Sequence, residues 1–210
     1  MKQEFPKTIP VFPLSGVIFF PKTNLPLNIF ENRYLELVKD SIKNDKLMGM
    51  IQTKKNGNEV YKIGCLGRIS DYEKSDDGRM LVNLTGVIRF EIAKEIENKK
   101  LYREFEVNYD KFNKDIVNEN LQTIDRDNIN LLIEKTKLFF KKNGLLLNWN
   151  EFKKLERTQQ INTLAMIAPV SNQEKQKMLE TISINDKTKT LSEIIEFYLH
   201  GSNINSKTVQ

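Results

Sequence analysis

The chain has 210 residues, of which 39% are hydrophobic and 29% are charged, and its formal net charge is +5. This length suits one large domain or two small ones with a buried core. A single cysteine excludes an intramolecular disulfide and a cysteine-based zinc site, and the basic excess, spread over separate lysine pairs, lacks the concentrated basic stripe of a typical nucleic-acid binder.

The first half of the chain has the periodicity of strands around one helix. Strands are predicted over 9–14, 24–29 and 47–52, because apolar residues recur there at every second position or in a short apolar run. After residue 30 the apolar spacing changes to that of a helix, which we predict over 31–44. A strand therefore passes directly into a helix.

This corner has two aromatic residues that we expect to fix the helix to the sheet. Phe30 and Tyr34 are predicted to be buried, one on each side of the corner. Glu31 falls where a carboxylate faces the positive end of the helix dipole. Arg33 is predicted to bind a neighbouring carboxylate or carbonyl group.

Alternating apolar residues predict a meander of further strands between residues 63 and 109. The meander contains a tight turn at Asp76–Gly78 and a break in the strand ladder at Gly86. In the strand after this break we expect Phe90 to point inward and Arg89 to point outward. Six or seven short strands in all indicate a small closed or nearly closed barrel, mixed or antiparallel.

From about residue 116 the apolar spacing is helical. Asn143–Gly144 predicts the end of one helix, and Ser171–Glu174 has the form of a capping box that begins another. Four amphipathic helices are predicted, with these apolar stripes: Ile129, Leu132, Ile133, Phe139 and Phe140; Ile161, Leu164, Ala165 and Ala168; Met178, Leu179 and Ile182; and Leu191, Ile194, Ile195 and Tyr198. Such stripes indicate a helical bundle.

An apolar run at 17–21 lies between two predicted strands, where polar turn residues are expected. One interpretation is that Val17 and Phe19 fill the end of the barrel as part of the core. The other is that Phe19 and Phe20, with Met48 and Met50, form an adaptable apolar surface that binds a partner. The sequence leaves both interpretations open.

The residues with catalytic potential have structural explanations. His200 is the only histidine and lies at a helix end, Asp76 and Asp77 suit a hairpin turn, and Cys65 suits a buried strand position. We therefore expect no catalytic residue, no metal and no cofactor. The N-terminus lacks the apolar run of a signal peptide, and no stretch approaches the roughly 20 apolar residues of a membrane helix, so we expect a cytoplasmic protein without membrane contact.

Several ordered motifs resemble the N-terminal, substrate-binding domain family of Lon proteases. The first are Ile9-Pro-Val-Phe-Pro-Leu14, Phe19-Phe-Pro21 and Ile29-Phe-Glu-Asn-Arg-Tyr34. The later motifs are 63–69, Asp77-Gly-Arg79 and Gly86-Val-Ile-Arg-Phe90. The resemblance makes Phe30, Glu31, Arg33, Tyr34, Arg89 and Phe90 the structural signature of the family in this chain.

The resemblance implies an α+β fold with a PUA-like β-barrel and one packed helix at 1–115, a helical bundle at 116–201 and a polar tail at 202–210. The chain contains neither a Gly-x-x-x-x-Gly-Lys-Ser/Thr phosphate-binding loop nor a context like that of the Lon catalytic serine. We therefore expect a stand-alone, non-enzymatic form of the domain.

The function that the resemblance implies is recognition of exposed or unfolded polypeptide, as a substrate-binding module or adaptor. Protein or peptide clients are the expected partners, and an ATP-dependent protease acting in trans is a further one that the resemblance allows. RNA binding by the PUA-like barrel is the alternative. The oligomeric state stays open.

Overall fold

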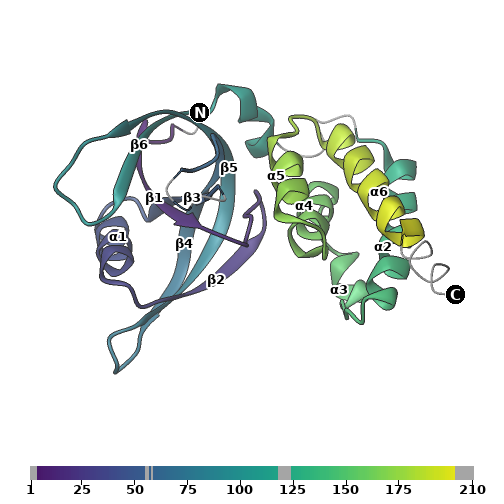
Figure 1. Ribbon diagram of the computed structural model, residues 1–210, viewed down its shortest axis with the longest axis horizontal. Coiled ribbons are helices and arrows are strands. Elements are labelled where there is room, and N and C mark those ends of the chain that lie inside the picture. The colour runs from purple at the N-terminus through teal and green to yellow at the C-terminus, as the bar shows by residue number, and fades with distance from the viewer. Residues whose placement is uncertain (1–3, 55–56, 58, 118–123, 202–210) are drawn as a thin grey trace, which may run out of the picture. The chain divides into compact units, whose positions relative to one another are not determined.

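The computed structural model describes residues 4–54, 57, 59–117 and 124–201. The chain divides into two compact units, Met1–Val117 and Asn118–Gln210. The first contains the strands and the second only helices, as Figure 1 shows. The polar tail expected at 202–210 lies outside the described residues.

Six strands of the first unit form one sheet, and five of them close into a ring. They are β1 (Thr8–Leu14), β2 (Asn24–Ile29), β3 (Leu47–Gln52), β4 (Ile63–Lys74), β5 (Met80–Ile96) and β6 (Arg103–Asn108). The order is β2-β5-β4-β3-β1-β6, and β6 also pairs with β5. The predicted barrel is confirmed, but it does not include every strand. The ring consists of β5, β4, β3, β1 and β6, and β2 is attached to it through β5 (Figure 1).

Strand direction and register agree with the predicted mixed barrel. β1 and β3 are parallel, while β4 is antiparallel to both β3 and β5. β5 continues through Gly86, and the predicted irregularity is a register shift, since Leu66 pairs with Ile88 and Gly67 with Gly86. A Cβ atom at position 86 would collide with the carbonyl oxygen of Phe20, so only glycine fits here.

The prediction that Arg89 points outward is wrong. Its side chain is buried, and its guanidinium forms a two-point ion pair with Asp115, at 2.7 Å from Nη2 to Oδ1 and 2.9 Å from Nε to Oδ2. Asp115 belongs to the 3-10 helix η1 (Asp110–Ile116), which the sequence did not predict. Phe90 is buried as predicted. Arg89 thus holds η1 against β5 through a buried pair.

Two aromatic residues were predicted to be buried at the corner between β2 and α1 (Asn32–Lys43), and one of them is. Tyr34 is buried and its ring lies 4.0 Å from that of Phe12. Phe30, in contrast, is 65% exposed. The prediction failed because the inward positions of β2 are Leu25 and Ile29, and alternation places residue 30 on the opposite face.

Of the two interpretations of the 17–21 run, the exposed apolar surface is wrong, and the core interpretation holds for Phe19 but not for Val17, which is 39% exposed. Phe19, Phe20, Met48 and Met50 are all buried in the first unit. Phe19 approaches Gly67 of β4, and the two methionines lie on β3, whose residues are all buried. These four side chains belong to the core, because the ring of strands has an interior that large apolar groups must fill.

The second unit consists of α2 (Arg126–Lys142), α3 (Trp149–Phe152), α4 (Arg157–Ile167), α5 (Asn172–Glu180) and α6 (Ile184–Gly201). The four predicted helices are present, and the short α3 was not predicted. The Ser171–Glu174 capping box is confirmed, and α2 is followed by its C-cap Asn143 and by Gly144 at a φ of 67°, as predicted. Ile182, expected in the third stripe, is exposed because α5 ends before it.

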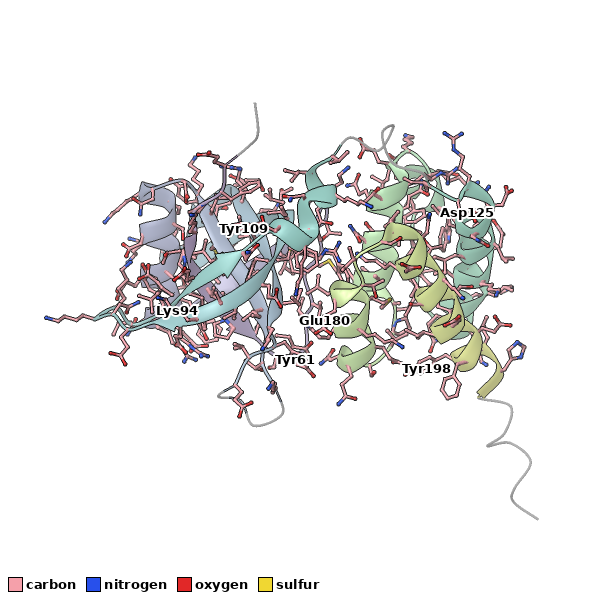
Figure 2. All side chains as sticks on the ribbon, turned by 90° about the horizontal axis from the view of Figure 1, so that it is seen from above. Tyr61, Lys94, Tyr109, Asp125, Glu180 and Tyr198 are labelled. Atoms are coloured by element: carbon pink, nitrogen blue, oxygen red, sulfur yellow. The ribbon has the colours of Figure 1, made fainter. Side chains whose placement is uncertain are left out.

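Helices α2 and α6 run in the same direction. Asn185 accepts from the backbone N–H of Asp125, Lys135 lies 2.8 Å from Glu196, and Lys142 reaches the carbonyl of Leu199. Figure 2 labels Asp125 at the start of α2 and Tyr198 near the end of α6. Matching ends of the two helices therefore meet.

Candidate functional site: the open edge of β2

The residues first considered for chemistry have structural surroundings. Cys65 is buried on β4, as predicted, and Asp77 forms an ion pair with Arg79 at the turn before β5. In the described parts of the chain, no group of three or more His, Cys, Asp or Glu side chains could hold a metal ion, and no helix is long and apolar enough to cross a membrane. We therefore looked for a binding site on the surface of each unit.

One edge of β2 has backbone groups that pair with no other described strand. β2 pairs with β5 alone among the described strands, so its other edge is open. The N–H of Gly86 donates to the carbonyl of Thr23 at 2.9 Å and the carbonyl of Gly86 accepts from the N–H of Lys22 at 2.8 Å, so both backbone groups of Gly86 face the β2 side of β5. Because hydrogen-bonded pairs alternate along an antiparallel ladder, the N–H and C=O groups of Asn24, Pro26 and Asn28 point away from β5.

Proline occupies the middle of this open edge. Pro26 has no N–H, which is tolerated here because an N–H at this position would not point toward β5. The edge therefore offers a donor and an acceptor at Asn24, an acceptor at Pro26, and a donor and an acceptor at Asn28. A missing central donor limits uncontrolled strand addition, which is how natural proteins protect open edges.

Apolar side chains lie beside this edge. Residues 24, 26 and 28 form the exposed face of β2, and Phe30 follows at the same alternation. Asn28 pairs with Leu81 of β5, which is 46% exposed. Since diagonal neighbours across an antiparallel pair lie about 7–8 Å apart, Phe30 and Leu81 border one surface. We call Asn24, Pro26, Asn28, Phe30 and Leu81 the β2 edge site.

The surroundings of the β2 edge site are charged and polar. Glu31 and Arg33 form an exposed ion pair at 2.8 Å, which confirms the predicted carboxylate partner of Arg33. The guanidinium of Arg33 also lies 4.5 Å from the centre of the Tyr34 ring. Burial raises the pKa of the Tyr34 phenol, so this group stays neutral. On the same sheet face, Glu73 of β4 is paired with Leu81.

Only part of this site could be found in the sequence. The alternation that makes Leu25, Leu27 and Ile29 inward also places Phe30 outward, and this signal was outweighed by the apolar character of phenylalanine. The open edge itself had no signal, because strand pairing depends on residues far apart in the chain. Leu81 and Asn28 are one example, since they become neighbours only when β2 adds to β5.

Comparisons with known proteins identify the family. The model of the ATP-dependent protease La (LON) substrate-binding domain matches residues 8–196. A Lon protease of Syntrophus aciditrophicus is 23% identical over 97% of this chain and 27% of that protein. A Lon protease of Buchnera aphidicola (subsp. Acyrthosiphon pisum) is 28% identical over 90% of this chain and 25% of that protein. The chain thus spans about a quarter of the length of these relatives.

Solved structures show the same fold. The crystal structure of a Lon N-terminal domain protein from Xanthomonas campestris gives a TM-score of 0.66 at 21% identity, over 88% of this chain and 96% of that chain. The N-terminal domain of the Mycobacterium avium complex Lon protease gives 0.64 at 15% identity, over 90% and 98%. Since the family model covers most of the sequence, the chain belongs to the LON substrate-binding domain family.

Proposed function

We propose that this chain binds exposed, extended polypeptide segments by adding them as a strand to the open edge of β2. The observation that carries the proposal is the row of outward backbone groups at Asn24, Pro26 and Asn28 beside an exposed Phe30. An extended peptide presents alternating donors and acceptors that match such a row, whereas a folded partner has already paired its own. The family's description as a substrate-binding domain supports a polypeptide ligand.

Affinity in this mode comes from the backbone and from one apolar anchor. Each backbone hydrogen bond contributes about 0.5–1.5 kcal/mol net, and burying an exposed phenylalanine contributes roughly 1.5–3 kcal/mol. Ordering a flexible client opposes these gains. The balance favours weak and reversible binding of many sequences, which suits a module that recognises unfolded segments.

The chain acts in this proposal as a recognition module without catalysis. Its match is to the substrate-binding domain of Lon, and a client captured at β2 would be delivered to an ATP-dependent protease acting in trans. The acidic Glu73 and Asp71 lie on β4, the strand beyond β5, and both are exposed, which disfavours a nucleic-acid backbone on this face of the sheet. Polypeptide is therefore the ligand that the site supports best.

The test removes the outward donors without touching the fold. In the double variant N24P/N28P both lost N–H groups point away from β5, so the ladder with β5 is kept. Binding of fluorescently labelled casein, measured by anisotropy, should weaken at least fivefold, while N24A/N28A should bind within twofold of the unchanged chain. Equal binding by both variants would refute strand addition, and tighter binding of a single-stranded RNA than of casein would favour the RNA alternative.

A further inference from the structure

A polar cleft of about 220 Å³ lies in the first unit, where the end of α1 meets the start of β1 and β6. It is bordered by the segment around Pro6, whose carbonyl accepts from the hydroxyl of Tyr109 at 2.8 Å; Figure 2 labels this tyrosine. Its charged lining residues are Asp40, Asp45, Lys100 and Glu104. Three carboxylates against one ammonium leave a formal charge of −2 in a small volume.

Two of these carboxylates lie at the unfavourable end of a helix. Asp40 is in the last turn of α1, and Asp45 follows the cap residue Asn44. The C-terminal end of a helix carries partial negative charge, so carboxylates there are repelled and cations are attracted. A positively charged group that enters the cleft would relieve this repulsion.

Each of the two carboxylates has an oxygen available. One oxygen of Asp40 accepts from the hydroxyl of Tyr102 at 2.9 Å, and one oxygen of Asp45 accepts from the backbone N–H of Leu47 at 3.0 Å. Within the described part of the chain, Asp40 Oδ1 and Asp45 Oδ2 accept no hydrogen bond. Both can therefore accept from a ligand.

A buried serine gives independent evidence for a ligand. Ser41 lines the cleft and is 2% exposed, and its hydroxyl has no hydrogen-bond partner among the described residues. Leaving a buried hydroxyl unpaired costs about 1–3 kcal/mol. A ligand with a donor would supply the missing partner.

The rim of the cleft already binds one ammonium group. Lys100 Nζ lies 2.6 Å from a carboxylate oxygen of Glu104 and 5.1 Å from the centre of the Tyr102 ring. A carboxylate and an aromatic face are the usual partners of an organic cation. The Tyr102 hydroxyl donates to Asp40, so the same tyrosine joins this ion pair to the carboxylate of Asp40.

We propose that this cleft binds a primary ammonium group, supplied by a lysine side chain of a polypeptide client; in naming the client this rests on the proposed function. An ammonium has three donors, which match Asp40 Oδ1, Asp45 Oδ2 and the Ser41 hydroxyl in kind and number. A guanidinium prefers both oxygens of one carboxylate, and here each aspartate has only one to offer. The cleft therefore selects lysine over arginine and adds a preference for lysine-containing segments.

The test uses blocked tripeptides, which are too short to add to β2 as a strand. Ac-Gly-Lys-Gly-amide, titrated into the isotope-labelled full chain, should shift the backbone amide signals of Ser41, Asn44, Asp45 and Leu47 in a saturable way. The same peptide with acetyl-lysine or arginine should bind at least fivefold more weakly. Equal shifts with acetyl-lysine would refute the ammonium site, and tighter binding by unblocked Gly-Gly-Gly-amide would refute the lysine assignment in favour of a chain N-terminus.

Matched variants separate the site from general electrostatics. D45N keeps the acceptor for Leu47 and should weaken lysine-peptide binding at least fivefold. D71N makes the same charge change at an exposed aspartate that also accepts from a backbone N–H, and it should bind within twofold of the unchanged chain. S41A should weaken binding without lowering the melting temperature, and equal losses in D45N and D71N would overturn the assignment. Because N24P/N28P leaves the cleft intact, failure of the β2 edge would not change these titrations.

Discussion

Both units expose apolar side chains, but in one unit they lie beside a strand edge and in the other they lie on helices. In the strand unit, Phe30 lies beside an open edge whose N–H and C=O groups have no partner among the residues that the structure describes. In the helical unit, Leu131, Leu138 and Phe197 are exposed on α2 and α6, where backbone groups are bonded within the helices. The difference shows that apolar exposure alone does not select a partner: the backbone beside it decides whether an extended chain can dock.

The interiors differ as well. The strand unit buries the ion pair between Arg89 and Asp115, and the uncharged side chains of Thr23, Ser41 and Gln52, among large apolar side chains. The helical unit buries several uncharged polar groups and one lysine, Lys187, whose ammonium donates to Asn162 at 2.7 Å. The buried lysine of the helical unit thus donates to a neutral amide, whereas the buried charges of Arg89 and Asp115 in the strand unit neutralise each other.

The largest effect is expected at the buried ion pair of the strand unit. R89A leaves Asp115 as an uncompensated buried charge, and it should lower the free energy of unfolding by about 3–5 kcal/mol. R103A removes a partly exposed pair with Glu95 of similar geometry and should cost at most about 1 kcal/mol. Urea unfolding of the full chain measures both, and equal losses would show that η1 is not held by Arg89.

The helical unit should respond less, and through hydrogen bonds. The side-chain amide of Gln160 donates to the carbonyls of Phe152, Lys153 and Leu155, at 3.3, 3.3 and 2.9 Å. Q160M keeps the volume but removes these three hydrogen bonds, although the carbonyl of Phe152 still accepts from the N–H of Leu155; we expect a loss of about 1–3 kcal/mol. Q173M, at an exposed position of α5, is the control and should change stability by less than about 0.5 kcal/mol. A melting temperature unchanged in Q160M would contradict this role.

The two exposed phenylalanines test the comparison directly. F30S should weaken casein binding about fivefold, because the proposed site loses its apolar anchor. F197S removes an equally exposed ring, 70% accessible, from α6 and should leave binding within twofold. Both changes should alter stability by less than about 0.5 kcal/mol, since neither side chain is in a core. A greater loss in F197S would place client binding on the helical unit.

The smallest expected effect is on chemistry. The purified chain should hydrolyse neither ATP nor casein, because its sequence contains neither a phosphate-binding loop of the Gly-x-x-x-x-Gly-Lys-Ser/Thr type nor a context like that of the Lon catalytic serine. Phosphate release and the appearance of casein fragments measure this. An activity that follows the protein through several columns and disappears in a point variant would contradict it.

The parts of the fold that could be predicted are those set by local pattern. The six strands, α1 and the four long helices follow from apolar spacing, and the Ser171 capping box follows from a four-residue motif. The burial of Arg89 could not be predicted, because its partner is 26 residues away on a short helix with little apolar periodicity. The spacing of apolar residues does not identify buried polar residues of this kind.

The candidate site shows the same division. The alternation in β2 predicts that Phe30 points outward, as the structure shows. The general preference for burying an aromatic residue predicts the opposite. The open edge depends on β2 pairing with β5 alone, and the acidic cleft depends on α1, β1 and β6 meeting. Both are properties of tertiary arrangement, so local sequence could not locate them.

Amide hydrogen exchange, followed by NMR of the labelled full chain with and without saturating casein, tests strand addition most directly. If a client pairs with β2, the exchange of the Asn24 and Asn28 amides should slow at least tenfold, because their outward N–H groups become hydrogen-bonded. The amide of Leu25, which already faces β5, should change little. Unchanged exchange at Asn24 and Asn28 in the casein-bound chain would contradict the account.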